Sequence, residues 1–356
     1  MTGGDGAHGA YVHIPFCAVR CDYCAFATWT DRDHLIASYL QALWTEIERA
    51  VDDGLPPVTS VFFGGGTPSM VPAAGLMVVL AALPLASEAE VTVECNPDTI
   101  TPDLLAAYRD GGVNRLSFGV QSMVPRVLRL LGRTHDPASV HRSVELARTA
   151  GFECFNLDII YGTVGESVAD WETTVCETLR LEPPHISAYG LTVEAGTPLA
   201  LDPARFPDDD DQAAKYELAD ELLGAAGLAS YEISNWARPG HECRHNLLYW
   251  SQGDYTGFGC AAHSHRAGRR WWNLRTPERF IAAVEEGSSA EAAAEVLDAE
   301  TRRLEGLQLQ LRTRTGVPAD ALEAAELPGL VEPHGDRLVL TRAGRLVANE
   351  VALRLR

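Results

Sequence analysis

Three cysteines near the start of the sequence, Cys17, Cys21 and Cys24, stand in a C-x3-C-x2-C spacing. They directly follow a short apolar run, Tyr11–Ile14, of the kind that forms a β-strand. Three thiolates on one loop offer soft, negatively charged ligands, which favour an iron–sulfur cluster or zinc. A closed zinc site or an all-cysteine [4Fe–4S] site needs a fourth ligand, but the nearest candidate position holds Phe26. Three cysteines would leave one iron of a cluster free to bind a substrate or cofactor.

This loop resembles the signature of the radical S-adenosylmethionine (SAM) superfamily, which has the same cysteine spacing and an aromatic residue, here Tyr23, before the last cysteine. The resemblance implies a [4Fe–4S] cluster on the three cysteines, with the amino and carboxylate groups of SAM on the remaining iron. In that superfamily, reductive cleavage of SAM gives a 5′-deoxyadenosyl radical. The alternative is three unrelated core thiols, since free cysteine often packs as a small hydrophobe. Regular spacing on one loop argues against that alternative.

Composition and charge narrow the classes of function. A chain of 356 residues can form one large domain and a smaller one, and 46% hydrophobic with 22% charged residues is typical of a globular protein. The net charge of −20 argues against general nucleic-acid binding, which uses a basic surface. No apolar run of about eighteen residues predicts a membrane span, and MTGGDGAHGA lacks the features of a signal peptide. A cytoplasmic location follows as the expectation, and it suits cysteines kept reduced for a cluster.

Strand-like and helix-like patterns alternate along the first half of the chain. Six segments read as strands: Tyr11–Ile14, Val58–Phe63, Glu90–Cys95, Arg115–Val120, Phe155–Tyr161 and Ile186–Leu191. Alternation of this kind predicts an α/β fold with a parallel sheet and right-handed crossovers. Six units are fewer than the eight of a closed barrel, so we predict a partial (β/α)6 TIM-like barrel, the architecture that radical-SAM relatives share. In parallel barrels the chemistry lies at the C-terminal ends of the strands.

The pattern changes near Pro277, where alanine- and glutamate-rich segments are expected to be helical. Further helices and one hairpin turn are predicted: Thr301–Leu311, Ala319–Glu326, Pro333–Asp336 and Arg342–Leu355. These elements suggest a small, mainly helical, winged-helix-like C-terminal domain, so we predict domains at residues 1–265 and 266–356. Winged-helix units often bind DNA, but a fold does not establish a function. The acidic chain favours a docking or lid role.

Glycine and polar residues follow several of the predicted strands. The turn Gly64-Gly65-Gly66-Thr67-Pro68 lets backbone groups approach a ligand closely. It resembles the superfamily segment that meets the amino group of SAM, so Gly66 and Thr67 are expected to contact SAM. Glu94 ends the next strand and could accept a hydrogen bond from a cofactor amine or ribose.

Further candidate residues lie at comparable positions. Gln121, Arg133 and Asp158 follow or end later strands, and the Arg133 guanidinium could pair with a carboxylate. The same resemblance assigns Tyr11 and Tyr23 to the cofactor site. A polar residue at one strand end is commonly a turn anchor instead. Convergence of several on one barrel mouth favours a binding site.

The resemblance narrows when five motifs are taken together: YVHIPFC, GGGTPS, RLSFGVQS, NLDIIYG and GFGCAAHS. Over nearly the whole chain they resemble the family that contains oxygen-independent coproporphyrinogen III oxidase and the haem chaperones. The oxidases have a further cysteine where this chain has Phe26, and an N-terminal extension where it has ten residues before Tyr11. The segment HNLLYW, residues 245–250, matches the HNxxYW pattern of the chaperones. All three features favour the chaperone branch.

The HNLLYW segment offers groups that could bind haem. His245 could be an axial ligand of haem iron, and Tyr249 and Trp250 supply flat apolar area for a macrocycle. The alternative is a buried histidine among core aromatic side chains. Other potential ligands and propionate-binding residues are nearby: His241, Cys243, His263, His265, Arg238, Arg244 and Arg266.

We therefore predict a haem chaperone that binds haem, carries a [4Fe–4S] cluster and SAM, and passes haem to apo-haem proteins such as respiratory enzymes. No catalytic residue is assigned. The main alternative is an oxygen-independent coproporphyrinogen III oxidase, which decarboxylates two propionates by radical hydrogen abstraction. A zinc-dependent regulator that uses the winged-helix-like unit is a third hypothesis.

Overall fold

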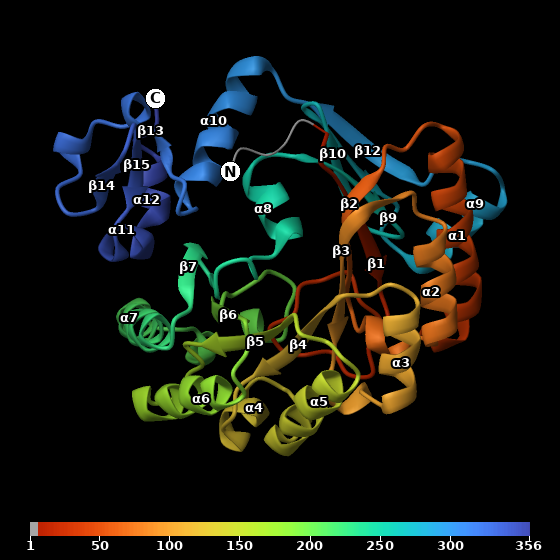
Figure 1. Cartoon of the computed structure of the whole chain (residues 1–356), viewed down its shortest axis with the longest axis horizontal. Coiled ribbons are helices and arrows are strands. Elements are labelled where there is room, and N and C mark those ends of the chain that lie inside the picture. Colours follow the sequence, from red (N-terminus) through yellow and green to blue (C-terminus); the bar gives the residue numbers. More distant parts are fainter. Residues whose placement is uncertain (1–5) are drawn as a thin grey trace.

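The computed structural model describes residues 6–356, and six parallel strands form the centre of its main sheet (Figure 1). They are β1 (His8–Ile14), β2 (Val58–Gly65), β3 (Leu85–Cys95), β4 (Arg115–Gln121), β5 (Phe155–Tyr161) and β6 (His185–Gly190). Each pairs in parallel with the next in chain order. The predicted partial (β/α)6 barrel is confirmed.

Helices cover the convex face of this curved sheet (Figure 1). They are α1 (Ile36–Asp52), α2 (Ala73–Ala81), α3 (Pro102–Asp110), α4 (Pro125–Leu130), α5 (Pro137–Thr149), α6 (Val168–Arg180) and α7 (Asp209–Ala225). Side chains alternate along each strand, so in β1 Ala10 and Val12 join the core beneath α1, while Tyr11 faces the concave side. The concave face is therefore left for the polar and aromatic residues of the site.

Both edges of the parallel sheet are extended to give twelve strands. Beyond β1 lie β9 (Asp254–Phe258), β10 (His263–Arg266), β11 (Arg269–Asn273) and β12 (Glu291–Val296), and beyond β6 lie β8 (Asn235–Ala237) and β7 (Ala229–Glu232). The helical expectation for the alanine- and glutamate-rich segment is correct for α9 (Pro277–Glu285) but wrong for β12. Pairing with β11 along its length overrides the helix propensity of β12.

The C-terminal unit has its own small core, in which Leu307, Leu311, Val317 and Val351 are buried. Its elements are α10 (Ala299–Leu311), β13 (Val317–Pro318), β14 (Val331–His334), β15 (Arg337–Leu340), α11 (Arg342–Leu346) and α12 (Ala348–Ala352). The predicted hairpin is present. The predicted helix at residues 319–326 is instead two separate 3-10 turns, and the closing helix is interrupted at Val347, whose backbone is not helical.

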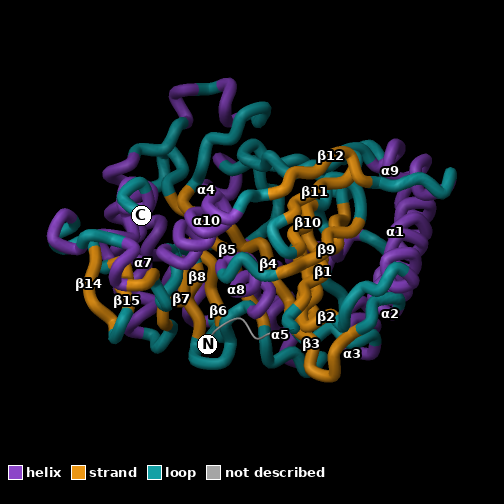
Figure 2. The backbone as a smooth tube through the Cα atoms, turned by 90° about the horizontal axis from the view of Figure 1, so that it is seen from above, coloured by secondary structure: helices purple, strands orange, loops and turns teal. Residues whose placement is uncertain are grey.

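The C-terminal unit lies against α7, at the opposite end of the molecule from α1 and α2 (Figure 2). Asp220 of α7 accepts hydrogen bonds from Arg342 at 2.7 Å and Arg345 at 2.9 Å. The predicted boundary between residues 265 and 266 falls inside the strand β10, and β11 and β12 continue the main sheet. We therefore propose a boundary near Asp298, before α10.

In the part of the chain that is described, no helix combines the length and apolar character needed to cross a membrane.

A buried ion group fixes the loop after β5 to α7. The Lys215 Nζ atom, in a fully buried side chain, lies 2.6 Å from Asp211 Oδ2 and 3.2 Å from Glu166 Oε2. It also donates to the backbone carbonyl of Glu166 at 2.8 Å, and the Glu166 carboxylate accepts from the Gly162 amide at 2.9 Å. The loop that these contacts hold borders the mouth of the barrel.

Replacing Lys215 with methionine should lower the free energy of unfolding by about 3–5 kcal/mol, because the Glu166 carboxylate would stay buried without its counter-charge. Urea denaturation of the single variant and of Lys215→Met with Glu166→Gln measures this. The double variant should regain part of the loss. A single variant as stable as the parent would contradict the stabilising role of the ion group.

Candidate functional site

The cysteine loop begins where β1 ends and closes on itself. The Trp29 amide donates to the Pro15 carbonyl at 2.8 Å, and the Cys17 amide donates to the Trp29 carbonyl at 3.0 Å. Inside the loop, the Cys24 amide donates to the Cys21 carbonyl at 3.2 Å. All three cysteine side chains remain partly exposed. The loop thus presents three thiols at the C-terminal mouth of the barrel.

The glycine turn after β2 supports this loop through its backbone. The Gly66 amide donates to the Ile14 carbonyl at 2.7 Å, and the Thr67 amide donates to the Phe16 carbonyl at 2.8 Å. A side chain at Gly66 would put its Cβ 2.6 Å from the Phe16 carbonyl oxygen and 3.0 Å from Cys17 Sγ. The position therefore excludes any residue larger than glycine.

Hydrogen-bond donors surround the thiols. Arg133 Nη1 donates to Cys21 Sγ at 3.4 Å, and the Thr67 hydroxyl donates to Cys17 Sγ at 3.7 Å. Burial raises the pKa of Cys17 to about 11, so without a ligand this thiol stays protonated at neutral pH. Metal coordination would remove that proton, and the two donors would then stabilise the thiolates.

The chemistry of the donor set suits a cluster. Within residues 6–356, no three His, Cys, Asp or Glu side chains gather around a point where they could hold a single metal ion. Cysteine thiolates are the usual ligands of a [4Fe–4S] cluster, in which each would bind a different iron. The donor set and its surroundings therefore suit such a cluster.

Two carboxyl groups lie deeper in the barrel. Glu94 accepts a hydrogen bond from the Gly65 amide at 3.1 Å, and burial, with a contribution from Asp158, raises its pKa to about 8. Asp158 accepts hydrogen bonds at 2.8 Å from Ser117 and from Asn156, and burial raises its pKa as well. Both border a mainly polar cavity on the concave face. At neutral pH Glu94 is thus largely protonated and can donate as well as accept a hydrogen bond.

Other predicted site residues lie near this mouth. Gln121 ends β4 with a positive φ of 62°, and a Cβ at Gly119 would lie 2.8 Å from its amide nitrogen and 2.7 Å from Arg133 Nη2. Gln121 and Arg133 therefore flank one glycine beside Cys21. Tyr11 stacks on Phe62 on the concave face, with ring centroids 6.4 Å apart.

His13 is a supporting residue that the sequence reasoning missed. Its Nε2 atom lies 2.9 Å from the Ala27 carbonyl in the cysteine loop, and its Nδ1 atom lies 3.0 Å from the Tyr11 hydroxyl. Because a carbonyl only accepts, Nε2 carries the proton and Nδ1 accepts from Tyr11. Burial lowers the pKa of His13 to about 4, which keeps the ring neutral. Its place in the YVHIPFC motif is the signal that could have identified it.

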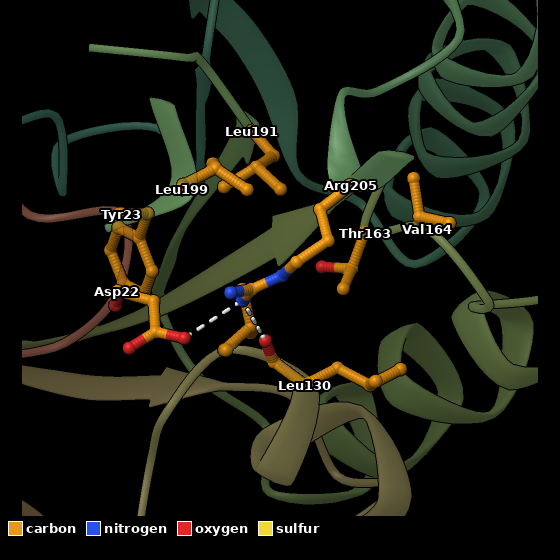
Figure 3. Close-up of a pocket in the computed structure, with 9 residues that line it drawn as sticks. Asp22, Tyr23, Leu130, Thr163, Val164, Leu191, Leu199 and Arg205 are labelled. Atoms are coloured by element: carbon orange, nitrogen blue, oxygen red, sulfur yellow. Dashed lines mark hydrogen bonds and ion pairs between the residues drawn. The ribbon is translucent and has the colours of Figure 1, made fainter. Parts of the chain in front are cut away.

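Tyr23 borders an apolar cavity of about 160 Å³ beside the cysteine loop (Figure 3). Leu191 and Leu199 line it, and Arg205 lies across it. Arg205 pairs with Asp22 of the loop at 2.9 Å and donates to the Leu130 carbonyl at 2.8 Å. These contacts tie the cysteine loop to the segment that follows β6.

The HNLLYW segment forms α8 (Arg244–Trp250), which lies on the concave face (Figure 1). His245 is 1% exposed, and both ring nitrogens are used: Nδ1 lies 2.9 Å from the Ser60 hydroxyl and Nε2 lies 2.8 Å from the Tyr249 hydroxyl. Ser60 precedes the end of β2 by five residues, roughly 16 Å of strand. The motif therefore lies deep in the barrel, away from the cysteine loop. To bind iron, His245 would have to give up a hydrogen bond.

The other histidines considered as ligands differ in how open they are. His241, in the loop before α8, is half-buried. His265 is 4% exposed, and its ring nitrogens bond with the Gly253 carbonyl at 3.0 Å and the Gly268 amide at 3.2 Å. His263 is exposed and stacks on Trp272, with centroids 5.7 Å apart and planes 26° apart. Partial burial and the nearby Arg270 lower the pKa of His263.

Comparison with known proteins places this site in a family. The Radical SAM superfamily model matches residues 11–175. The heme chaperone HemW of Mycobacterium tuberculosis is 42% identical, over 96% of this chain and 93% of that protein. The heme chaperone HemW of Bacillus subtilis is 33% identical, over 96% of this chain and 97% of that protein.

A solved structure shows the same fold. Coproporphyrinogen III oxidase (HemN) from Escherichia coli, described as a radical SAM enzyme, superposes with a TM-score of 0.86 over 98% of this chain and 90% of that one, at 23% identity. The chain therefore belongs to the radical-SAM superfamily and, within it, to the family of the proteins named heme chaperone HemW.

Replacing Gly66 with alanine should lower the free energy of unfolding by about 1–3 kcal/mol, because the added methyl group meets backbone carbonyl oxygens that cannot move aside. Gly224→Ala is the matched control, since a Cβ there has nothing within 4 Å. Chemical denaturation of both variants tests this. Equal stability of the two variants would show that the turn and the loop adjust freely.

The raised pKa of Glu94 predicts a pH dependence of stability. The folded-state value of about 8 lies above the ordinary value of 4.5, so the folded protein favours the protonated form. Stability from this group is complete below pH 4.5 and is lost as the pH rises toward 8. The free energy of unfolding, relative to that of Glu94→Gln, should therefore fall across this range. A difference that stays constant with pH would contradict the assignment.

Proposed function

We propose that this protein is a haem chaperone, which binds haem and passes it to apo-haem proteins such as respiratory enzymes. The observation that carries the proposal is the 42% identity to a protein named heme chaperone, over nearly the full length of both chains. The cytoplasm is the proposed location, because an iron–sulfur cluster requires cysteines that are kept reduced.

Cys17, Cys21 and Cys24 would hold a [4Fe–4S] cluster, with SAM at the iron that has no cysteine. The amides of Gly65, Gly66 and Thr67 already donate to other groups, so the backbone of the turn can offer an incoming ligand only carbonyl acceptors. An amino group is a donor and suits such a site. In this superfamily the cluster supplies the electron that cleaves SAM.

The remaining predicted residues would hold and orient this cofactor. Arg133, next to Cys21, would offset the negative charge of the thiolates and is well suited to a carboxylate. Gln121 and Glu94 would supply further hydrogen bonds to the cofactor. Asp158 lines the deeper polar cavity together with Glu94 and would support the site from there. Tyr11 and Tyr23 would border the site from the strand and from the loop.

Oxygen-independent coproporphyrinogen III oxidase remains the second candidate, because the E. coli oxidase shares the fold. At the position where the oxidases carry a further cysteine, this chain has Phe26, whose side chain is 62% exposed and contributes no thiol. This difference favours the chaperone.

This chain has a net charge of −20, which repels other proteins of negative charge. A negatively charged recipient would therefore have to recognise it through specific contacts. The C-terminal unit is the surface we propose for this contact. The C-terminal unit has its own hydrophobic core, and ion pairs from Arg342 and Arg345 to Asp220 attach it to the barrel. Its outer surface could therefore contact a recipient without disturbing the cofactor site.

Anaerobically reconstituted protein should contain roughly four irons per chain, bind haem, and transfer it to an apo-cytochrome without forming protoporphyrinogen from coproporphyrinogen III. Metal and sulfide analysis, haem spectroscopy and a turnover assay with SAM and a reductant measure these properties. Cys24→Ser should lose most of the iron, whereas Cys176→Ser, on the outer helix α6, should not. Efficient formation of protoporphyrinogen would reject the chaperone in favour of the oxidase. Zinc without iron or sulfide would favour a regulator.

A further inference from the structure

The concave face of the barrel continues past β1 onto β9, β10 and β11. Tyr11 pairs with Gly257, and Tyr255 pairs with His265, so His265 shares the face of Tyr255. Tyr255 contacts Tyr249 of α8, with ring centroids 4.6 Å apart, which identifies that face as the concave one. His263, two residues before His265 in the same strand, points to this side as well.

Of the candidate histidines, His263 is exposed and His241 is half-buried, and neither ring has a hydrogen-bond partner among residues 6–356. Of these two, His263 is the more open and stacks on Trp272. His245 and His265 are almost fully buried, and each uses both ring nitrogens. An axial ligand must offer a nitrogen lone pair to the iron at a position that a macrocycle can reach. From these contacts we infer that His263 is the axial ligand of the haem cargo.

This inference rests on the proposed haem-chaperone function and names the place of its cargo. The bond is a coordinate bond from one imidazole nitrogen to the iron, and no electron is transferred in forming it. Trp272, cross-strand from His263, gives the imidazole a fixed orientation and adds flat apolar area beside the iron.

The surroundings favour haem over a bare metal ion. A single ion would need three or four protein ligands, and no such group exists in the described part of the chain. Haem brings four nitrogen ligands of its own, so one histidine is enough. A cation also lies on this face, because Arg270 pairs in register with His265. Its guanidinium already contacts Glu295 and Glu305, each at 2.9 Å, so a propionate would have to displace one of these carboxylates.

The position places haem beside the cofactor site. Tyr11 of the proposed SAM site pairs with Gly257, and the His263 carbonyl approaches Gly257 so closely that a Cβ there would lie 2.2 Å from it. Only β9 therefore separates the strand that carries Tyr11 from the strand that carries His263. A haem at His263 would lie on the open side of the same face, outside the region that α8 covers.

Haem titration of the full-length protein, followed by the Soret band and by electron paramagnetic resonance, tests the assignment. His263→Ala should weaken haem binding at least roughly tenfold and change the ligand signature, and added imidazole should restore that signature. His245→Gln, which keeps hydrogen-bonding groups in place of the buried ring, and His141→Ala, on the outer surface of α5, should keep the signature of the parent. Trp272→Leu should lower affinity without changing the signature.

Retention of the parental signature in His263→Ala would overturn the inference, whatever its affinity. Loss of that signature in His245→Gln alone, with circular dichroism unchanged, would move the ligand to α8 and leave the chaperone function standing. If the parent protein binds no haem under any of these conditions, the proposed function itself fails, and the inference fails with it.

Discussion

Two backbone hydrogen bonds, from Gly66 to the Ile14 carbonyl and from Thr67 to the Phe16 carbonyl, determine where the cysteine loop lies. They join the turn after β2 to the start of the cysteine loop after β1. Because a side chain at Gly66 would collide with the same carbonyl groups, the two segments approach as closely as backbone permits. The thiols are therefore positioned by two neighbouring parallel strands. Because the sheet is rigid, these hydrogen bonds also restrict the movement of the cysteine loop.

The same sheet separates two environments. Its convex face is closed by helices and is apolar, whereas its concave face carries carboxyl, hydroxyl and imidazole groups that hydrogen-bond with one another. A buried polar group is costly unless it is paired, and here Asp158 has two donors while His13 has one partner on each nitrogen. Glu94, with one amide donor, is the least satisfied of these groups and holds its proton. The site thus limits its buried charge before any cofactor enters.

Much of this arrangement could be predicted from the sequence. The six strands follow from alternating patterns, and the ends of parallel strands meet at one edge, so Thr67, Glu94 and Gln121 had to converge. Features that depend on partners far away in the chain could not be predicted. The strand β12 exists because β11 lies beside it, and the depth of His245 is set by Ser60, 185 positions earlier. A motif reveals which groups are present, but the fold decides which of them remain open.

The burial of His245 and the exposure of His263 carry different consequences for the proposed chaperone, which would have to release the haem that it binds. Haem on His245 would require the loss of a hydrogen bond to Ser60 or Tyr249, each worth about 1 kcal/mol, and displacement of α8 from the sheet. Both costs would be incurred on entry, and the helix would have to open again on exit. A ligand on an open strand has no such barrier, so its release is governed by the iron–nitrogen bond and the contact with Trp272. Differences in affinity between related complexes arise mostly from dissociation rates, and a carrier gains from a site that a recipient can reach directly. On this reasoning His245 acts through structure, by holding α8 against β2, and under the proposed function the exchange of haem would take place at His263 on β10.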